Sequence, residues 1–363
     1  MRYTFLTIFF ILLQFLSFGA GRWLQWMLKP YVNASTLPWL MVAVYVVGNG
    51  LLLLSFLSFF RSVSWWLALL WLLLLSTLFT ALIWWVSKHF IAQNQLIHLI
   101  RGVSILSYIG MIGFAIFNAY SPTVRYLNIE IDKPMAKPMT FAMVSDTHLG
   151  KMVGNRQLEK LYQILQQNPI DIVLIPGDVM DDDTTVFDKE KMQDNFTKIA
   201  KSAKLGAFAT LGNHDLYRTH AFESIQKDIQ QSGFQLLNDR AVLVDGVWIV
   251  GRYDDHHPER AKTVDLLKEI DTIKPVILLD HRPTEIEQHQ DLPIDLQVSG
   301  HTHDGQVFPA NFVVKMMYPL AYGYEQRGKG HYVVSSGFGF WGIPFRLGSR
   351  AEVWIITMTG KKA

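Results

Sequence analysis

Four long stretches without a charged residue lie in the first third of the chain, and they constrain its fold more than any other feature. A helix needs about 20 predominantly apolar residues to cross the hydrocarbon core of a bilayer. Lys and Arg residues lie between the stretches and tryptophans lie near several ends, as is typical of membrane-spanning helices. We therefore predict a transmembrane region over residues 1–122, with four helices at about 3–21, 37–60, 63–86 and 102–121.

Two features of this region allow alternatives. The first stretch resembles a signal peptide, but Gly19-Ala20-Gly21 is a poor cleavage site, so we expect the stretch to be retained. The break at Gly48-Asn49-Gly50 indicates either a groove facing lipid or substrate, or close packing between helices. Four spans place both termini on one side of the membrane, and the Lys and Arg count in short loops leans weakly toward a C-terminal domain outside the cytoplasm.

Beyond Arg125 the charge density rises to that of a soluble protein. We place a linker at 123–139 and a second domain at 140–360. The formal net charge is only +2, so no broad basic field indicates nucleic acid as a partner. The chain has no cysteine, which excludes disulfides, zinc–thiolate sites, iron–sulfur clusters and cysteine nucleophiles.

Short β-branched runs alternate with helical patterns in this second domain, which predicts a layered α/β fold. The predicted strands are 141–144, 172–175, 207–211, 248–250, 276–279, 296–298, 332–335 and 353–357. The predicted helices are 156–167, 188–202, 221–231 and 259–270.

Five predicted strands end in side chains that bind metals. The segments are Ser145-Asp146-Thr147-His148, Pro176-Gly177-Asp178, Gly212-Asn213-His214-Asp215, Asp280-His281 and Gly300-His301-Thr302-His303. In open α/β sheets, ligands bind beyond the carboxyl ends of the strands. Each segment alone has an ordinary explanation, such as a turn or a helix cap. Together they predict a site of nitrogen and oxygen donors that suits manganese, iron or zinc, with enough donors for a pair of ions.

The ordered series of motifs resembles the calcineurin-like metallophosphoesterase superfamily, and most of all its membrane-attached bacterial branch of YkuE/YaeI-like proteins. The resemblance covers about residues 140–357 and implies a four-layer α/β/β/α domain with two divalent metal ions. It implies that Asp146, His148 and His303 bind the first ion and that Asn213, His281 and His301 bind the second, with Asp178 bridging them. His214 would stabilise the transition state or donate a proton to the leaving oxygen, oriented by Asp215. Two positions depart from the family pattern, since Asp304 replaces a glycine and Asp280 replaces a common serine.

The resemblance implies hydrolysis of a phosphoester or a pyrophosphate. Arg346 is expected to contact the phosphate, because guanidinium suits phosphate geometry. His256 is a second candidate for substrate binding, although the polar segment around it fits a solvated loop better. The membrane region favours a lipid-linked substrate, for example a UDP-diacylglucosamine-type precursor, with membrane lipids as further partners. We expect an integral protein of the bacterial inner membrane, and the sequence does not determine the oligomeric state.

Two other classes of function are weaker interpretations. A non-catalytic scaffold of the same fold would be expected to lose ligands, yet every matched ligand is present. A metal transporter would need acidic or histidine residues at mid-depth in the four spans, which contain no such pair.

Overall fold

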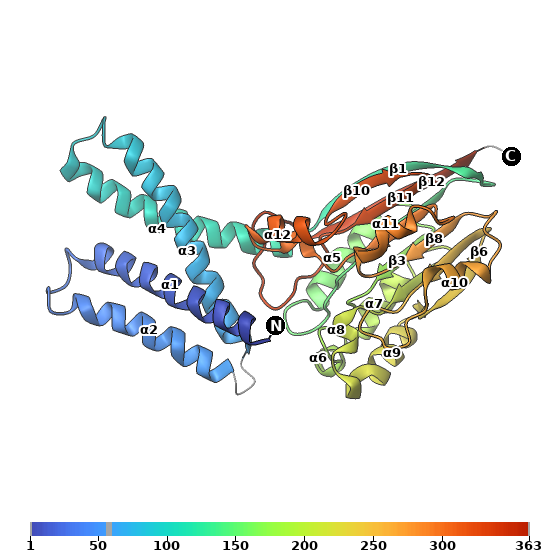
Figure 1. Ribbon diagram of the computed structural model, residues 1–363, viewed down its shortest axis with the longest axis horizontal. Coiled ribbons are helices and arrows are strands. Elements are labelled where there is room, and N and C mark those ends of the chain that lie inside the picture. Colours follow the sequence, from blue (N-terminus) through green and yellow to red (C-terminus); the bar gives the residue numbers. More distant parts are fainter. Residues whose placement is uncertain (1, 56–59, 362–363) are drawn as a thin grey trace. The chain divides into compact units, whose positions relative to one another are not determined.

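The structure is a computed structural model that describes residues 2–55 and 60–361. The chain divides into two compact units, Met1–Ile116 and Phe117–Ala363 (Figure 1). Each unit is built around its own apolar interior.

The first unit consists of four long helices. They are α1 (Arg2–Leu28), α2 (Leu37–Leu54), α3 (Phe60–Ser87) and α4 (Gln93–Tyr120), the last of which ends in the second unit. All four are long and apolar enough to cross a membrane, which confirms the four predicted spans and makes this a membrane protein. Positions 56–59 of the predicted 37–60 span lie outside the described residues. Helices α1 and α4 are longer than predicted, because Arg22 and Arg101 are accommodated inside them.

Close packing explains Gly48 in the second span, whereas a Cβ atom at Gly50 would have no neighbour within 4 Å. Helix α2 continues through Gly48, and a Cβ atom there would lie 3.1 Å from Trp66 Nε1 and 3.2 Å from Ser17 Oγ. Asn49 accepts a hydrogen bond at Oδ1 from Gln14 Nε2 at 3.0 Å, which joins α1 to α2. The packing interpretation therefore fits this segment better than the groove interpretation.

The second unit contains two six-stranded sheets. In order across the first sheet, the strands are β1 (Thr123–Pro134), β12 (Glu352–Lys361), β2 (Met139–Met143), β3 (Ile172–Pro176), β4 (Gly206–Thr210) and β5 (Gln235–Leu236). Across the second they are β10 (Gly323–Arg327), β11 (Gly330–Val334), β9 (Leu296–Ser299), β8 (Val276–Leu279), β7 (Val247–Gly251) and β6 (Arg240–Val244). Strands β2–β5 are parallel, and so are β7, β8, β9 and β11.

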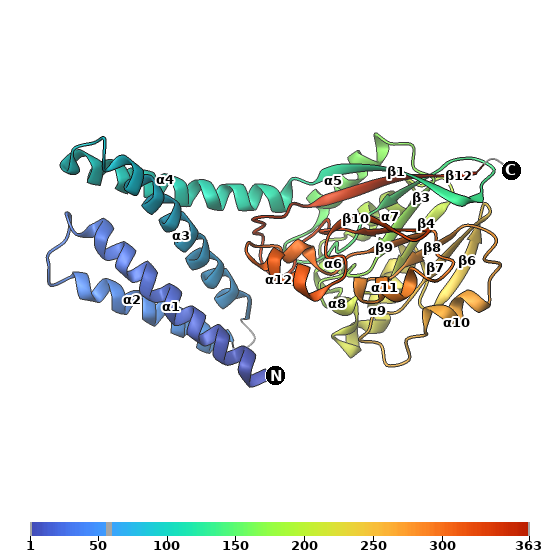
Figure 2. The ribbon, with the colours of Figure 1, turned by 45° about the horizontal axis from the view of Figure 1, so that its top comes forward.

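Alternating side chains place the sheets in the middle of four layers. In β2, Phe141 and Met143 pack into the core between the sheets, whereas Ala142 packs on the helical side. Helices α5 (Asn155–Gln166), α7 (Gln193–Ala200) and α9 (Phe222–Gln231) cover the first sheet, and α10 (Thr263–Lys268) and α11 (Ile286–His289) contact the second (Figure 2). The α/β/β/α architecture is confirmed.

Two expectations differ from the structure. The expected linker at 123–139 is largely strand β1, which pairs in parallel with β12 from Thr123↔Glu352 to Ile131↔Gly360. The helix expected at 188–202 is two helices, α6 (Thr185–Lys189) and α7, because Lys191 takes a left-handed conformation with φ of 50° between them.

Candidate metal centre

The loops after β2, β3, β4, β8 and β9 carry all seven predicted metal ligands. Five of these ligands have left-handed backbone conformations, namely Asp146 (φ 52°), His148 (φ 44°), Asp178 (φ 50°), His301 (φ 70°) and His303 (φ 50°). Such conformations cost about 1–3 kcal/mol each in a residue other than glycine, and they cluster at functional sites. The left-handed residues in these loops therefore orient the predicted ligand side chains toward one another.

Glycines in the motifs make room for these side chains. A Cβ atom at Gly212 would overlap Asp178 Oδ1, and one at Gly300 would overlap Asp146 Oδ2. Gly177 has a φ of 85°, and a Cβ atom there would lie 2.5 Å from His281 Nδ1. The motif glycines are thus required by contact with the donors themselves.

The first group of donors consists of Asp146, His148 and His303, whose ligand atoms all lie within 4.8 Å of one another. His148 Nε2 is 3.1 Å from His303 Nε2, and His303 Nε2 is 3.6 Å from Asp146 Oδ1. Burial lowers the pKa of His148 to about 3 and also lowers that of His303 well below its usual value. Both imidazoles are therefore neutral, which is the form that binds metals.

The second group consists of Asp178, His281 and His301. His281 Nε2 lies 3.2 Å from Asp178 Oδ2 and 3.2 Å from Asn213 Oδ1. On the other side of the ring, His281 Nδ1 lies 2.9 Å from the carbonyl oxygen of Pro176. This contact favours a proton on Nδ1 and leaves Nε2 facing the donors, as in many metal-binding histidines. Burial lowers the pKa of His301 to about 3, so this ring is neutral. Burial also acts to lower the pKa of His281, but the charge of Asp178 and the hydrogen bond to it raise that pKa to about 10, so a metal ion bound at Nε2 would take the place of a proton.

Asp178 lies between the two groups. Its Oδ2 atom is 3.2 Å from His281 Nε2 and 3.7 Å from His148 Nε2, which belongs to the first group. Its Oδ1 atom accepts a hydrogen bond from the backbone N–H of His214 at 2.8 Å. One carboxylate is therefore positioned to contact ions in both groups.

An unsatisfied carboxylate oxygen at this site fits a bound cation. Asp146 Oδ2 is buried and has no hydrogen-bond partner among the described residues. Burial raises the pKa of Asp146 to about 6, which reflects the cost of a buried carboxylate without a cation. The chemistry of the donors and this unsatisfied oxygen both fit divalent metal ions.

His214 borders the first group but contacts a different carboxylate from the one expected. Its Nδ1 atom lies 2.7 Å from Asp182 Oδ1, and its ring centroid is 4.8 Å from that of His148. Burial acts to lower the pKa of His214, but the hydrogen bond to Asp182 and the charge of Asp178 give a net increase. Asp182 is a functional candidate that the sequence interpretation missed, although the run Asp181-Asp182-Asp183 directly after the second motif was a signal.

Asp215, in contrast to Asp182, contacts backbone groups and not the ring of His214. Its carboxylate accepts hydrogen bonds from the backbone N–H groups of Val179 at 3.1 Å, Met180 at 2.8 Å and Gly212 at 2.9 Å. It thereby ties the loop after β3 to the start of the short helix α8 (Asn213–Leu216). The expectation that Asp215 orients the ring of His214 is wrong, because its carboxylate is taken up by these three donors.

Of the two predicted substrate contacts, Arg346 lies beside a donor, with its Nη2 atom 3.1 Å from His303 Nδ1, and His256 contacts none of the seven donors in the described contacts. Arg346 is fully buried, and its Nη2 atom donates to the carbonyl oxygens of Ser336 and Gly339, both at 2.6 Å. It holds this turn in place beside His303, and its contact with a phosphate stays a prediction. His256 is exposed and lies 3.0 Å from Asp254 Oδ1, with its ring 5.1 Å from that of Tyr217. Substrate binding by His256 stays a prediction.

The aspartate at position 280 adds no free charge to the site. It is fully buried and accepts hydrogen bonds from Arg252 Nη1 at 3.1 Å and Arg260 Nη2 at 2.7 Å. Asp304 differs, because its Oδ1 atom is buried without a hydrogen-bond partner among the described residues and burial raises its pKa to about 6.

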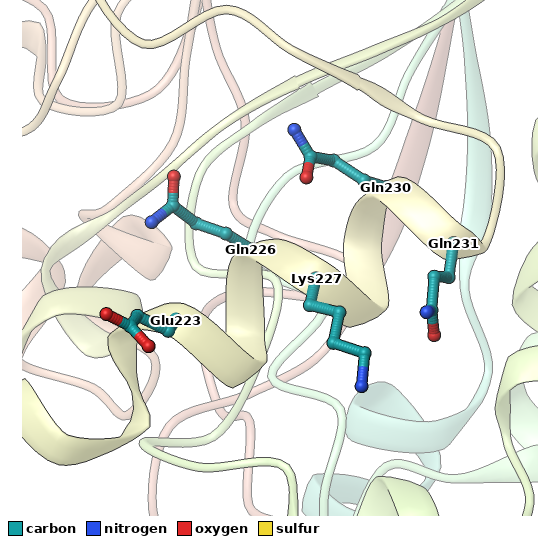
Figure 3. Close-up of a pocket in the computed structure, with 5 residues that line it drawn as sticks. All are labelled: Glu223, Gln226, Lys227, Gln230 and Gln231. Atoms are coloured by element: carbon teal, nitrogen blue, oxygen red, sulfur yellow. The ribbon is translucent and has the colours of Figure 1, made fainter.

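A pocket of about 320 Å³ opens over the donors. Its walls are partly polar and partly apolar, and its lining consists of Asp178, Asn213, His214, Tyr217, His301, Thr302, His303, Gly305, Gln306, Ala310, Val314 and Trp341. A separate depression of about 530 Å³ lies along α9 (Figure 3) and is lined by Glu223, Gln226, Lys227, Gln230 and Gln231. That depression contains none of the predicted site residues and lacks the histidines that the metal chemistry needs.

Comparison with known proteins agrees with this geometry. Residues 139–305 match the family described as calcineurin-like phosphoesterase. An uncharacterized metallophosphoesterase of Helicobacter pylori strain J99 is 31% identical over 66% of this chain and 65% of that protein, just under two thirds of its length. A transmembrane protein with metallophosphoesterase domain from Danio rerio is 28% identical over 66% of this chain and 58% of its own length. The uncharacterized metallophosphoesterase YkuE of Bacillus subtilis is 26% identical over 59% of this chain and 77% of its own length.

Proposed function

We propose that this chain, which carries a calcineurin-like metallophosphoesterase domain, is a membrane-anchored hydrolase of phosphoric esters that works with two divalent metal ions. The single observation that carries the proposal is the pair of buried donor groups that meet at Asp178. Seven donors without a thiolate exceed the needs of one ion and suit a pair.

The ligand roles follow from these contacts. Asp146, His148 and His303 would hold one ion, and the other would be held by Asn213, His281 and His301, with Asp178 shared. When bound, the two ions would polarise a phosphoryl group and lower the pKa of water enough to supply a nucleophile at neutral pH.

The protein's own proton donor in this proposal is His214. Its ring borders the pocket, and the hydrogen bond to Asp182 and the charge of Asp178 raise its pKa, which favours the protonated ring that can give a proton to the leaving oxygen. The hydrogen bond from Nδ1 to Asp182 holds the ring and leaves Nε2 available. Asp182 is therefore a positioning residue.

The substrate class proposed is a phosphoester or pyrophosphate attached to a lipid, of which a UDP-diacylglucosamine-type precursor is one example. Four spans tether the catalytic domain to a bilayer, where a lipid-linked substrate is concentrated relative to bulk solution. The apolar wall of the pocket at Ala310, Val314 and Trp341 supports the same assignment.

A substrate panel tests the proposal. The full chain, purified in detergent, would be assayed with manganese, iron or zinc against soluble phosphomonoesters, phosphodiesters and lipid-linked pyrophosphates. We expect metal-dependent hydrolysis that chelation abolishes. A chain that binds metal but hydrolyses nothing in the panel would favour the alternative, a metal-binding scaffold of the same fold.

A further inference from the structure

Helix α12 (Ala310–Met317) carries an exposed apolar surface beside the metal pocket. None of its residues is buried. The α12 surface, as we define it, comprises Phe308 (38% exposed), Phe312 (56%), Val313 (48%), Met316 (80%), Met317 (65%) and Trp341 (49%). Single exposed apolar residues are ordinary, but a cluster of this kind marks a site of interaction with a protein or a membrane.

The α12 surface is continuous with the pocket wall. Ala310 and Val314 from the same helix line the pocket, and so does Trp341, which belongs to both. Gln306 binds the backbone of Trp341 in both directions, since its Nε2 donates to Trp341 O at 3.0 Å and its Oε1 accepts from Trp341 N at 2.9 Å. The two parts of the surface are therefore held together as one structure.

The bilayer is the occupant that the surrounding contacts favour. The last turn of α4, the end of a candidate membrane span, belongs to the second unit. There Tyr120 packs edge-on against Phe340 with ring centroids 5.2 Å apart, and Asn118 Nδ2 donates to Arg346 O at 3.2 Å. The 340–346 segment thus joins the end of the span to Trp341, so the α12 surface is linked to the point where the chain leaves the membrane.

The composition of α12 agrees with a lipid interface. Large apolar side chains are combined with one exposed cation, Lys315, and with the tryptophan at position 341. Helices that lie in the headgroup region have this combination, with apolar side chains inserted about 5–10 Å and basic residues near the headgroups.

We propose that the α12 surface lies in the bilayer interface, so that the metal pocket opens at the lipid surface and receives a lipid-linked phosphate without its leaving the membrane. The assignment of a substrate rests on the proposed function, but the membrane contact itself does not. Each part therefore has its own test.

The membrane contact is tested with a fluorescent probe on the full chain. The chain has no cysteine, so Met316→Cys introduces one labelling site. A matched control is Ile273→Cys, which is 77% exposed against 80% for Met316 and precedes β8, at the opposite end of that strand from His281. In nanodiscs with nitroxide-labelled lipids, the probe at 316 should be quenched and blue-shifted, whereas the probe at 273 should not. Equal quenching of the two probes would overturn the proposal.

The consequence for catalysis is tested with Phe312→Ser combined with Met316→Ser. We expect hydrolysis of a lipid-linked pyrophosphate in vesicles to fall by about tenfold or more, because the local concentration of substrate at the site is lost. Hydrolysis of a soluble phosphodiester should stay unchanged, which also shows that the variant folds. If both activities fall, the double variant has lost its fold, and the single variant Met316→Ser is assayed in its place against the same two substrates.

The outcomes separate the two proposals. An unchanged rate on the lipid-linked substrate would overturn the role of the α12 surface while leaving the phosphoesterase assignment intact. Quenching at position 316 in a chain that hydrolyses neither substrate would retain the membrane contact and refute the proposed enzyme activity.

Discussion

Asp178 is the residue on which both donor groups depend, since its carboxylate lies near His148 on one side and near His281 on the other. Asp178→Asn replaces a charged oxygen with a neutral amide and should lose metal from both positions together with activity. Elemental analysis of the purified variant measures this loss. Asp245→Asn, which changes an exposed carboxylate paired with Lys137, is the matched control and should keep its metal. Full metal content in Asp178→Asn would show that Asp178 does not serve both ions.

The pair of His214 and Asp182 gives a prediction about protons. His214→Ala should keep both ions and lose about 10²–10⁴-fold in turnover with a poor leaving group, the range of a positioned proton donor. Asp182→Asn should show the same pattern with a smaller loss of about 10–100-fold. Asp183→Asn, which removes a contact to Arg218 instead, is the control.

The dependence on the leaving group distinguishes the possible roles of His214. An acidic leaving group departs without a proton, so His214→Ala should slow the hydrolysis of substrates with such groups much less. An equal loss for good and poor leaving groups would indicate stabilisation of charge instead of proton transfer. Loss of metal from His214→Ala would make this residue a ligand.

At the scale of single elements, the loop after β8 depends on a buried ion network. Arg252, just after β7, donates to Asp280 at 3.1 Å and to Glu285 at 2.7 Å. Removing one partner of a buried pair costs about 3–5 kcal/mol when the other charge is left unpaired, and Arg252→Met should cost less than this because Arg260 still pairs with Asp280. Arg252→Met should therefore lower the thermal unfolding temperature and weaken metal binding through His281, the next residue after Asp280. Arg240→Met on exposed β6 should change neither, and an unaltered Arg252→Met would refute the role of the network.

The ends of the buried central strands could be predicted most accurately from the sequence, and the edge strands least accurately. Buried runs such as Ile172–Ile175 have strong β-branched character, so their ends and the ligands beyond them follow from the sequence. Strand β1 occupies most of the segment where a linker is expected, directly after the membrane spans. Its alternation of Leu127, Ile129 and Ile131 with polar residues was nevertheless a strand signal, but its partner β12 lies more than 200 residues away and only the folded chain shows the pairing.

The side-chain contacts within the site were less predictable than its ligands. Motif spacing predicts which residues gather as candidate metal ligands, but it carries no information about which carboxylate reaches His214. That depends on the direction of the loop after β3, where Asp182 has a φ of 70°. The burial of Arg346 likewise depends on the 336–339 turn folding over it, and no local pattern predicts that.

At the scale of the whole molecule, the number of spans determines topology. Four helices long enough to cross a membrane require both ends of the chain to face the same compartment. Reporter fusions at residues 1 and 363, one active only inside and one only outside, should therefore give the same answer. Opposite answers from an uncleaved chain would reject the four-span arrangement, and the segment around Gly48–Gly50 would be the first place to reconsider.

The central claim is that two ions together make this chain a hydrolase, and metal reconstitution tests it most directly. The full chain would be stripped with chelator, reloaded with increasing manganese, and measured at each step for bound metal by elemental analysis and for hydrolysis of a soluble phosphodiester. We predict close to two ions per chain at saturation, no activity without metal, and full activity only when both positions are filled. Activity that persists in the stripped chain, or that is complete with a single ion, would contradict the account.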